Sequence, residues 1–254
     1  MGIAYKVFVT NLKREPDKKE HILRQLGAAG LQAEIIEAID GKELSEAQLD
    51  EMVYDHKNCG LAKGTIGNAL SKLKIYNRML DEGIPVALML EDDAVLQPRT
   101  KAVLEEIVLN DNGSKPAVYI LSHVTDYLPL TKRAFETCTL YKLYRGFNNH
   151  GYVLNLAAVK KLHGLLYPVI FESDRWEYFK LILNLDIYCV IPHVIDTADT
   201  QKKMSSIEAE RIGRPKGLRK AYRARMVMKK FPLFWIKKLF YRVVVRLFAK
   251  INYI

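Results

Sequence analysis

Residues 86–94 read Val-Ala-Leu-Met-Leu-Glu-Asp-Asp-Ala. The five apolar residues in a row predict a strand that is covered on both faces, as in the sheets of α/β proteins. Before it, apolar residues between Ile66 and Leu80 recur at helical spacing, and Gly83 ends that predicted helix. The strand therefore carries three consecutive carboxylates to its carboxyl end, where open α/β sheets build their binding sites.

The alternation of short apolar runs and helical patterns continues in both directions from this stretch. Further strands are expected at residues 5–12, 33–38, 117–121, 152–154 and 187–191. Helices are expected between them at residues 16–29, 100–108, 156–166 and 174–183. Strands and helices that alternate in this way predict an α/β fold with a mostly parallel central sheet.

The composition is that of a folded chain with a large core, because 49% of the 254 residues are hydrophobic. Cys59, Cys138 and Cys189 are odd in number and far apart in the sequence. Neither a disulfide framework nor a zinc site is indicated, and a reducing compartment is expected. The apolar stretch near the start is too short for a signal peptide, and no run approaches the roughly 18–20 residues that span a bilayer. A cytoplasmic location is therefore expected.

Positive charge is concentrated at the end of the chain. The formal net charge is +10, and residues 211–254 hold 14 Lys or Arg but no Asp or Glu. The remaining residues contain 25 basic and 29 acidic side chains and are mildly acidic. This division predicts a body of residues 1–212 and a basic tail of residues 213–254.

The three carboxylates after the apolar run suggest a cation site. Alternation along the strand puts Glu91 and Asp93 on one side and Asp92 on the other. Two carboxylates on one side can hold Mg²⁺ or Mn²⁺, and such a cation can neutralise a diphosphate. His193, after the last predicted strand, is a candidate third ligand, with an ordinary structural histidine as the alternative. For the carboxylates, the alternative is a solvated acidic turn.

Five short segments occur in order along the chain: Val-Thr-Asn-Leu-Lys-Arg (9–14), Ala-Ile-Asp-Gly (38–41), Gly-Asn-Ala-Leu-Ser-Lys (67–72), Leu-Glu-Asp-Asp (90–93) and Gly-Tyr-Val-Leu (151–154). They resemble the I-N-L-x-R, A-x-D-G, G-C-x-x-S-H, L-E-D-D and G-Y-v-i-s motifs of glycosyltransferase family 25. This family includes bacterial lipooligosaccharide biosynthesis proteins and collagen galactosyltransferases. The resemblance covers about residues 5–210, and Asn68 and Lys72 stand where the family usually has Cys and His.

The resemblance implies a GT-A-like fold that binds a nucleotide sugar and inverts the anomeric carbon. The implied donor is UDP-galactose, or in some members UDP-glucose, and the implied acceptor is a sugar of lipooligosaccharide or lipopolysaccharide. In this hypothesis Glu91 and Asp93 hold Mn²⁺ or Mg²⁺, and Asp92 contacts the ribose or the sugar of the donor. Residues 1–212 would form the catalytic domain.

Other polar residues at predicted strand ends are candidates for donor binding. Asn11 and Arg14 lie at the end of the first predicted strand. Arg14 could meet a phosphate or stack on the base, with an ordinary surface arginine as the alternative. Asp40, before Gly41, could accept a hydrogen bond from uracil or ribose, or form a simple Asp-Gly turn. Ser205 lies in a polar stretch that could close over the diphosphate or be a solvated loop.

An inverting transfer needs a group that takes the proton of the acceptor hydroxyl. Asp174 is the candidate base, because it stands where a helix is predicted to begin and the family carries an Asp there. A helix N-cap is the alternative role, and acceptor binding is a third. Glu172 and Glu177 are the fallback bases. Trp176 is a candidate sugar platform, or else a core residue.

The basic tail has an amphipathic pattern after Pro232. Lys238, Arg242, Arg246 and Lys250 are four residues apart and form one stripe of a helix, with aromatic and aliphatic residues on the other side. This pattern is typical of a helix that lies on an anionic membrane surface. We therefore expect a peripheral protein on the inner face of the plasma membrane, acting on a lipid-linked oligosaccharide. Packing of the same helix against the body is the alternative.

Two rival functions remain at this point. A metal-dependent phosphotransferase or nuclease could use the same acidic cluster, and a non-enzymatic membrane-bound scaffold could use the tail alone. Nucleic-acid binding is not expected, because the body is acidic and no nucleic-acid-binding motif is present.

Overall fold

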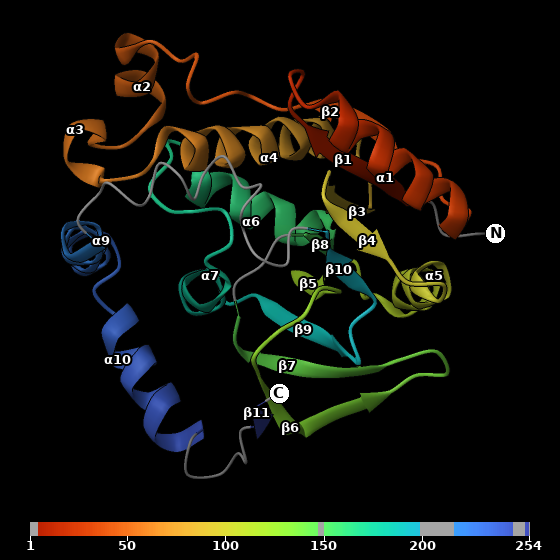
Figure 1. Cartoon of the computed structure of the whole chain (residues 1–254). Coiled ribbons are helices and arrows are strands. Elements are labelled where there is room, and N and C mark those ends of the chain that lie inside the picture. The colour runs from red at the N-terminus through yellow and green to blue at the C-terminus, as the bar shows by residue number, and fades with distance from the viewer. Residues whose placement is uncertain (1–4, 147–149, 199–215, 246–251, 254) are drawn as a thin grey trace.

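One mixed sheet runs through the molecule, with helices packed on both of its faces (Figure 1). The computed structural model describes residues 5–146, 150–198, 216–245 and 252–253. In this part of the chain, the sheet has nine strands in the order β11-β6-β7-β9-β5-β8-β3-β1-β2. These strands are β1 (Lys6–Asn11), β2 (Glu34–Glu37), β3 (Val86–Glu91), β5 (Ala117–Ile120), β6 (Asp126–Ala134), β7 (Thr139–Arg145), β8 (Gly151–Asn155), β9 (Asp186–Ile191) and β11 (Asn252–Tyr253). A separate antiparallel ladder joins β4 (Ala94–Leu96) and β10 (Ile195–Thr197).

The helices cover the sheet because successive residues of its central strands point to opposite faces. In β3, Ala87 and Met89 pack toward α4 and α6, whereas Val86, Leu88 and Leu90 pack toward α1 and α5. The described helices are α1 (Pro16–Ala29), α2 (Glu46–Met52), α3 (His56–Cys59), α4 (Lys63–Asp81), α5 (Thr100–Asn110), α6 (Leu156–Leu166), α7 (Trp176–Leu183), α9 (Lys216–Lys230) and α10 (Phe234–Phe240), followed by a π-helical turn (Tyr241–Val245). The apolar run at residues 86–90 is therefore a central strand.

Strand directions bring distant segments to one edge of the sheet. β1 is parallel to both β2 and β3, and Thr10 lies opposite Glu91. β8 is antiparallel to β3, with Gly151 opposite Leu90. The start of β8 therefore lies beside the carboxyl ends of β1 and β3, which places His150 next to Glu91.

The loop after β2 rests directly on the first turn of α4. A Cβ atom on Gly41 would collide with the backbone carbonyl of Lys63, and one on Gly67 would collide with the carbonyl of Ile39. Only glycine allows two backbones to approach this closely. These contacts fix Asp40 above the carboxyl edge of the sheet.

The α/β architecture expected from the sequence is confirmed. The observed bounds of α1 and α6 agree with the predicted residues 16–29 and 156–166. The sheet is mixed: β1, β2, β3, β5, β6 and β9 run in one direction, and β7, β8 and β11 run in the other. The β6–β7 hairpin was not predicted from the sequence, and the second half of β6 is largely exposed.

The basic tail packs on the body within the described residues. Tyr222, Met226, Val227 and Phe234 are buried and belong to the same hydrophobic core as α4 and α6. Figure 1 shows α9 and α10 along one side of the molecule, where α9 contacts α3 and α10 contacts α7. The boundary predicted at residues 212–213, and with it Arg246 and Lys250, lies outside the described residues.

The outward side of α10 is apolar, because its lysines face the body. Lys237 Nζ donates to the carbonyl of Leu181 at 3.2 Å, and Lys238 Nζ lies 2.9 Å from Glu177 Oε1. Exposed apolar side chains of this segment are Leu233, Trp235, Ile236, Leu239, Phe240 and Val243, which we call the outer apolar face. No described helix is both long enough and apolar enough to cross a bilayer.

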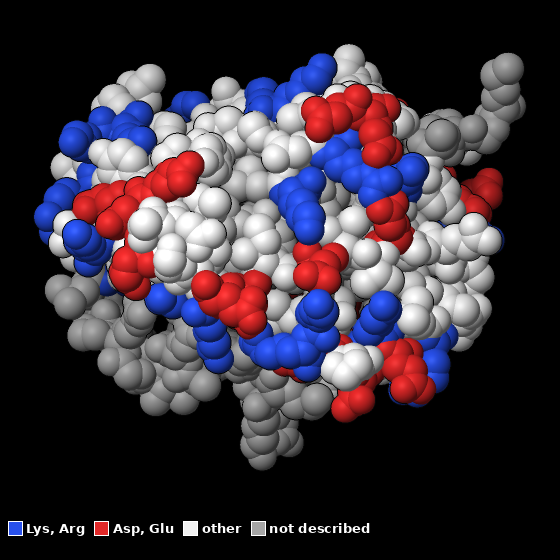
Figure 2. All heavy atoms as spheres, turned by 90° about the horizontal axis from the view of Figure 1, so that it is seen from above, with Lys and Arg blue, Asp and Glu red and all other residues white. Residues whose placement is uncertain are grey.

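Charges of both signs are interspersed on the face of the molecule seen in Figure 2. Several side chains of the body form ion pairs, such as Arg24 with Glu20 at 2.8 Å and Lys63 with Glu46 at 3.2 Å. This mixture agrees with the near balance of acidic and basic residues before position 211.

Candidate active site

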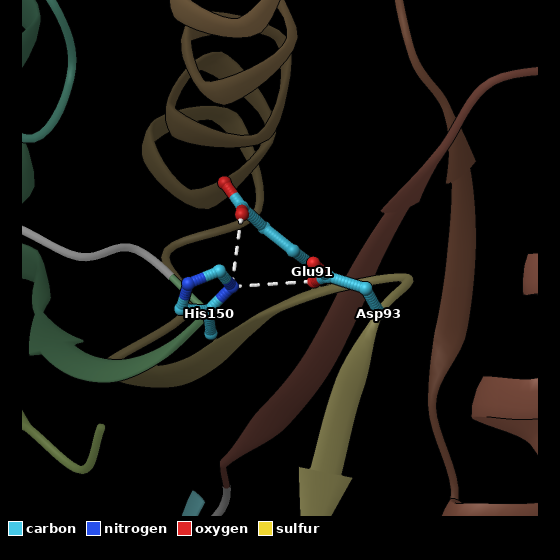
Figure 3. Close-up of side chains that lie close together, drawn as sticks. All are labelled: Glu91, Asp93 and His150. Carbon is cyan, nitrogen blue, oxygen red and sulfur yellow. Dashed lines mark hydrogen bonds and ion pairs between the residues drawn. The ribbon is translucent and has the colours of Figure 1, made fainter. Parts of the chain in front are cut away.

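Glu91, Asp93 and His150 converge at the carboxyl edge of the sheet (Figure 3). Nδ1 of His150 lies 3.2 Å from Oδ1 of Asp93 and 3.5 Å from Oε2 of Glu91. One ligand atom from each residue lies within 4.8 Å of the others, and all three side chains are partly buried. The ends of β3 and β8 supply these groups, so the antiparallel pairing of the two strands creates the cluster.

The cluster fits a divalent cation by the chemistry of its donors. Two carboxylates and one imidazole are a donor set that Mn²⁺ accepts, and the carboxylates also suit Mg²⁺. Burial alone would raise the pKa of Asp93, but the hydrogen bond and charge of His150 hold the pKa of that carboxyl below its usual value. Burial opposes protonation of His150, yet the bond to Asp93 and the charge of Glu91 raise the pKa of its imidazole. The acidic pair thus attracts positive charge, as a cation site must.

Neighbouring side chains fix the orientation of the two carboxylates. Asn68 Nδ2 donates to Glu91 Oε1 at 3.2 Å, and Thr197 Oγ1 donates to Asp93 Oδ2 at 3.0 Å. Lys72 is fully buried, with Nζ 3.7 Å from Glu91 Oε1, and burial lowers the pKa of its ammonium group. Asn68 and Lys72, the two departures from the family motif, therefore both contact Glu91.

A cavity of about 280 Å³ opens beside the acidic cluster. The ends of β1, β3 and α4 line it together with the loop after β2, and its volume is close to the lower end of typical small-molecule sites. Its polar wall includes five of the residues expected to bind a donor or a metal: Arg14, Asp40, Glu91, Asp92 and Asp93.

The residues expected to bind the donor pair with one another around this cavity. Asn11 Nδ2 donates to Asp92 Oδ2 at 2.8 Å, and burial raises the pKa of Asp92 to about 6. Arg14 forms an ion pair with Asp40, and both residues line the cavity. The structure thus brings Asn11, Arg14, Asp40 and Asp92 to one place, whereas Ser205 lies outside the described residues.

Asp174 lies in the loop that enters α7. The N-cap residue of α7 is Arg175, so Asp174 does not occupy the helix-cap position. Its neighbour Ser173 donates from Oγ to Oδ1 of Asn68 at 2.7 Å, and Asn68 in turn contacts Glu91. The loop that carries Asp174 is therefore tied to the acidic cluster.

The structure argues against the two fallback bases and against the sugar platform. Glu172 is buried among arginines, and although burial opposes its charge, Arg175 and Arg223 lower its pKa to about 2, so it is a poor proton acceptor. Glu177 is engaged by Lys238. Trp176 is 1% exposed and packs edge-on against Tyr152, which makes it a core residue.

His193 does not join the carboxylates. Its Nε2 lies 2.7 Å from Asp196 Oδ1, and its ring packs edge-on against His123. The imidazole at Glu91 and Asp93 is that of His150, to which sequence analysis gave no role. His150 precedes β8, and in a parallel sheet it would lie at the opposite edge from Glu91. Because β8 is antiparallel to β3, it begins at the edge where β3 ends. Its position directly before the Gly-Tyr-Val-Leu segment was the signal available in the sequence.

The fold and this site define an α/β protein with a cavity of about 280 Å³ beside a cluster whose donor atoms fit a divalent cation. Residues 4–176 match the family model described as "Glycosyltransferase family 25 (LPS biosynthesis protein)". Because that match covers more than half of the chain, the chain belongs to glycosyltransferase family 25.

Individual relatives agree with this assignment. Human procollagen galactosyltransferase 2 is 25% identical over 169 residues, which cover 62% of this chain. A glycosyltransferase 25 family member of Drosophila melanogaster is 35% identical over 103 residues, 37% of this chain, and the human "Inactive glycosyltransferase 25 family member 3" is 26% identical over 117 residues, 43% of this chain. The matched segments amount to 27%, 16% and 20% of these relatives' own lengths.

Among solved structures, a glycosyltransferase involved in glycosylation of the major capsid of PBCV-1 covers 82% of this chain and 99% of its own. Its sequence identity is 11% and its TM-score is 0.41, a likeness too low to support a conclusion.

Proposed function

We propose that this protein is a metal-dependent, inverting glycosyltransferase that moves a hexose from a UDP-sugar onto a glycan acceptor. The observation that carries the proposal is the cluster of Glu91, Asp93 and His150 at the wall of the cavity that Arg14 and Asp40 line. UDP-galactose is the donor we favour, because matched relatives are named as galactosyltransferases. A sugar of lipooligosaccharide or lipopolysaccharide is the acceptor we favour, in line with the description of the family model.

Each part of the site has a distinct role in this proposal. Glu91, Asp93 and His150 would hold Mn²⁺ or Mg²⁺, which supplies positive charge to the leaving diphosphate. Asn11 orients Asp92 toward the donor. Arg14 and Asp40 bind the nucleotide at the mouth of the cavity, where the guanidinium can exchange Asp40 for a phosphate or stack on the base.

Asp174 is the proposed general base. An inverting displacement needs a carboxylate on the acceptor side of the sugar, and the loop with Asp174 approaches the cluster from the side of α7. The carboxylate of Asp174 would take the proton of the acceptor sugar's hydroxyl as the new glycosidic bond forms.

The proposal is tested by donor binding and by transfer. Calorimetric titrations with UDP, UDP-galactose, UDP-glucose and CDP, with and without Mn²⁺, should show that Mn²⁺ tightens binding of the UDP-sugars. Asp93→Asn should abolish this gain and reduce turnover to less than about a tenth of wild type, because it removes one ligand of the cation. Asp81→Asn, an exposed aspartate at the end of α4, is the matched control.

Three results would contradict the proposal. Retention of turnover by Asp93→Asn at saturating Mn²⁺ would exclude the assigned metal site. Release of phosphate from simple substrates without any sugar acceptor would favour a phosphotransferase or nuclease. Binding of UDP without any transfer would place the protein with the inactive members of its family.

We also propose that the tail brings the protein to the anionic inner face of the plasma membrane, where lipid-linked acceptors are built. The outer apolar face of α10 can enter the headgroup region, and the exposed Lys229 and Arg242 flank it. Phe240→Ser should weaken sedimentation with anionic vesicles, because it removes apolar surface that would enter the headgroup region. Leu130→Ser, at an exposed position of β6, is the control. Equal sedimentation of both variants would refute this role of α10.

A further inference from the structure

A buried carboxylate joins the tail to the loop that carries the proposed base. The side chain of Glu172 is 4% exposed. Arg223 of α9 donates from Nη1 to both of its oxygens at 2.9 Å, and Arg175 donates from Nη2 at 2.7 Å. Arg219, one turn earlier in α9, lies 3.7 Å away. Three guanidinium groups thus surround a single carboxylate, and two of them belong to the tail.

Hydrogen bonds continue from this ion cluster to the candidate metal ligands. Ser173, next to Glu172, donates to Oδ1 of Asn68 at 2.7 Å, and Nδ2 of Asn68 donates to Glu91 at 3.2 Å. Because the amide oxygen of Asn68 accepts from Ser173, its NH₂ group must face Glu91. In the reverse orientation, an amide oxygen would face the carboxylate and repel it. Ser173 therefore restrains the side chain of Asn68, and Asn68 in turn holds Glu91.

The helix that supplies Arg223 is itself firmly seated. Val227 is fully buried, and the hydroxyl of Tyr222 donates to the carbonyl of Tyr54 at 3.3 Å. α9 also lies close to the end of α3, where a Cβ atom on Gly60 would come within 3.6 Å of the Cα atom of Arg219. Arg223 therefore starts from a fixed point of the body and can hold the loop in one place.

We propose that Arg223 is a positioning residue of the active site, which acts through Glu172, Ser173 and Asn68 to orient the metal ligand Glu91. The inference rests on the proposed function and goes beyond it, because it makes the tail a working part of the site rather than an attached membrane address. Undocking of α9 would release the loop, and metal binding and transfer would weaken together. The nucleotide end of the cavity, at Arg14 and Asp40, would be unaffected.

The experiment compares Arg223→Ala, Arg223→Lys and Glu172→Gln in the full chain, with Arg225→Ala as the matched control. Arg225 lies two residues further along the same helix and is exposed. Free Mn²⁺ is counted by electron paramagnetic resonance in the presence of UDP, which measures metal affinity without turnover. kcat and KM for the UDP-sugar, UDP affinity without metal and the melting temperature are measured alongside.

Arg223→Ala and Glu172→Gln should weaken Mn²⁺ binding by about three- to tenfold. This is less than the ~10–100-fold of a direct partner of a ligand, because three residues separate Arg223 from Glu91 and two separate Glu172 from it. The double variant should bind Mn²⁺ no more weakly than the single variant of lower affinity, since both changes break the same link. Arg223→Lys should lie between wild type and Arg223→Ala, because it keeps the charge but loses the two-pronged contact. In these variants kcat should fall together with metal affinity, while the affinity for UDP without metal stays at the wild-type value. Arg225→Ala should match wild type in every measurement.

The inference fails if the folded Arg223 variants bind Mn²⁺ as tightly as wild type, or if Arg225→Ala weakens binding equally. It also fails if only the melting temperature changes. Should Arg223→Ala not fold, Arg223→Lys and Glu172→Gln decide the question by the same measurement. A wild-type protein that transfers no sugar, but whose Mn²⁺ affinity depends on Arg223, would refute the proposed function and leave this inference standing.

Discussion

Replacement of Glu172 by glutamine removes one negative charge from a buried cluster and keeps the shape of the side chain. The pKa of Glu172 is about 2 in the folded protein, against a usual value of 4.5, because Arg175 and Arg223 outweigh the opposing effect of burial. This difference corresponds to about 3 kcal/mol of folding free energy at neutral pH. Since the carboxylate is almost fully buried, screening by solvent reduces this value little. We therefore expect Glu172→Gln to lower the free energy of unfolding by about 3 kcal/mol at pH 7.

The sign of the pH dependence follows from the lowered pKa. The unfolded chain takes up a proton at Glu172 before the folded protein does, so the stabilisation is complete above pH 4.5 and is lost as the pH falls toward 2. At pH 3 the advantage of wild type over Glu172→Gln should have shrunk to about 1 kcal/mol.

Urea denaturation of both proteins at pH 7 and pH 3, followed by circular dichroism, measures this difference. Glu177→Gln is the control, because Glu177 is more exposed and pairs with Lys238 of the tail. Its loss should cost about 1 kcal/mol or less. A loss from Glu172→Gln that is equal at the two pH values, or below about 1 kcal/mol at pH 7, would refute the assigned ion cluster.

Two further predictions concern the base and the backbone of the cavity. Asp174→Asn should lower turnover at least about a hundredfold and leave UDP-sugar affinity unchanged, because an amide cannot take a proton; lost affinity would instead place Asp174 in the donor site. Gly67→Ala should destabilise the fold by about 1–3 kcal/mol, since its Cβ atom would collide with the carbonyl of Ile39. Gly27→Ala, with open space around it in α1, should stabilise by about 0.5–1 kcal/mol, and thermal unfolding compares the two variants. Equal changes in stability for Gly67→Ala and Gly27→Ala would contradict the close contact between Gly67 and Ile39.

Much of the site could be predicted because its residues lie where local patterns end. Glu91 and Asp93 come at the end of an apolar run, Asn11 is the last residue of β1, and Asp40 follows β2. Parallel β1, β2 and β3 carry all of these residues to one edge. These positions could be predicted from apolar periodicity, because the formation of each strand depends mainly on residues close to it in the sequence.

His150 could not be assigned in the same way. Its role depends on the direction of β8, and the sequence pattern of a short buried strand is the same in either direction. The antiparallel pairing of β8 with β3 puts the start of one strand beside the end of the other. His193, which the pattern favoured, is instead held by Asp196.

Residue order along the chain was enough to predict the α/β class, the bounds of several helices, the acidic end of β3 and the basic character of the tail. The packed fold was needed to show which histidine joins the carboxylates, that Trp176 is a core residue, and that the tail contacts the loop of Asp174 through Arg223 and Glu172. The reason is the range of the interactions. Apolar spacing and charge are local properties of the chain, whereas a contact between residues 51 positions apart exists only when packing brings their segments together.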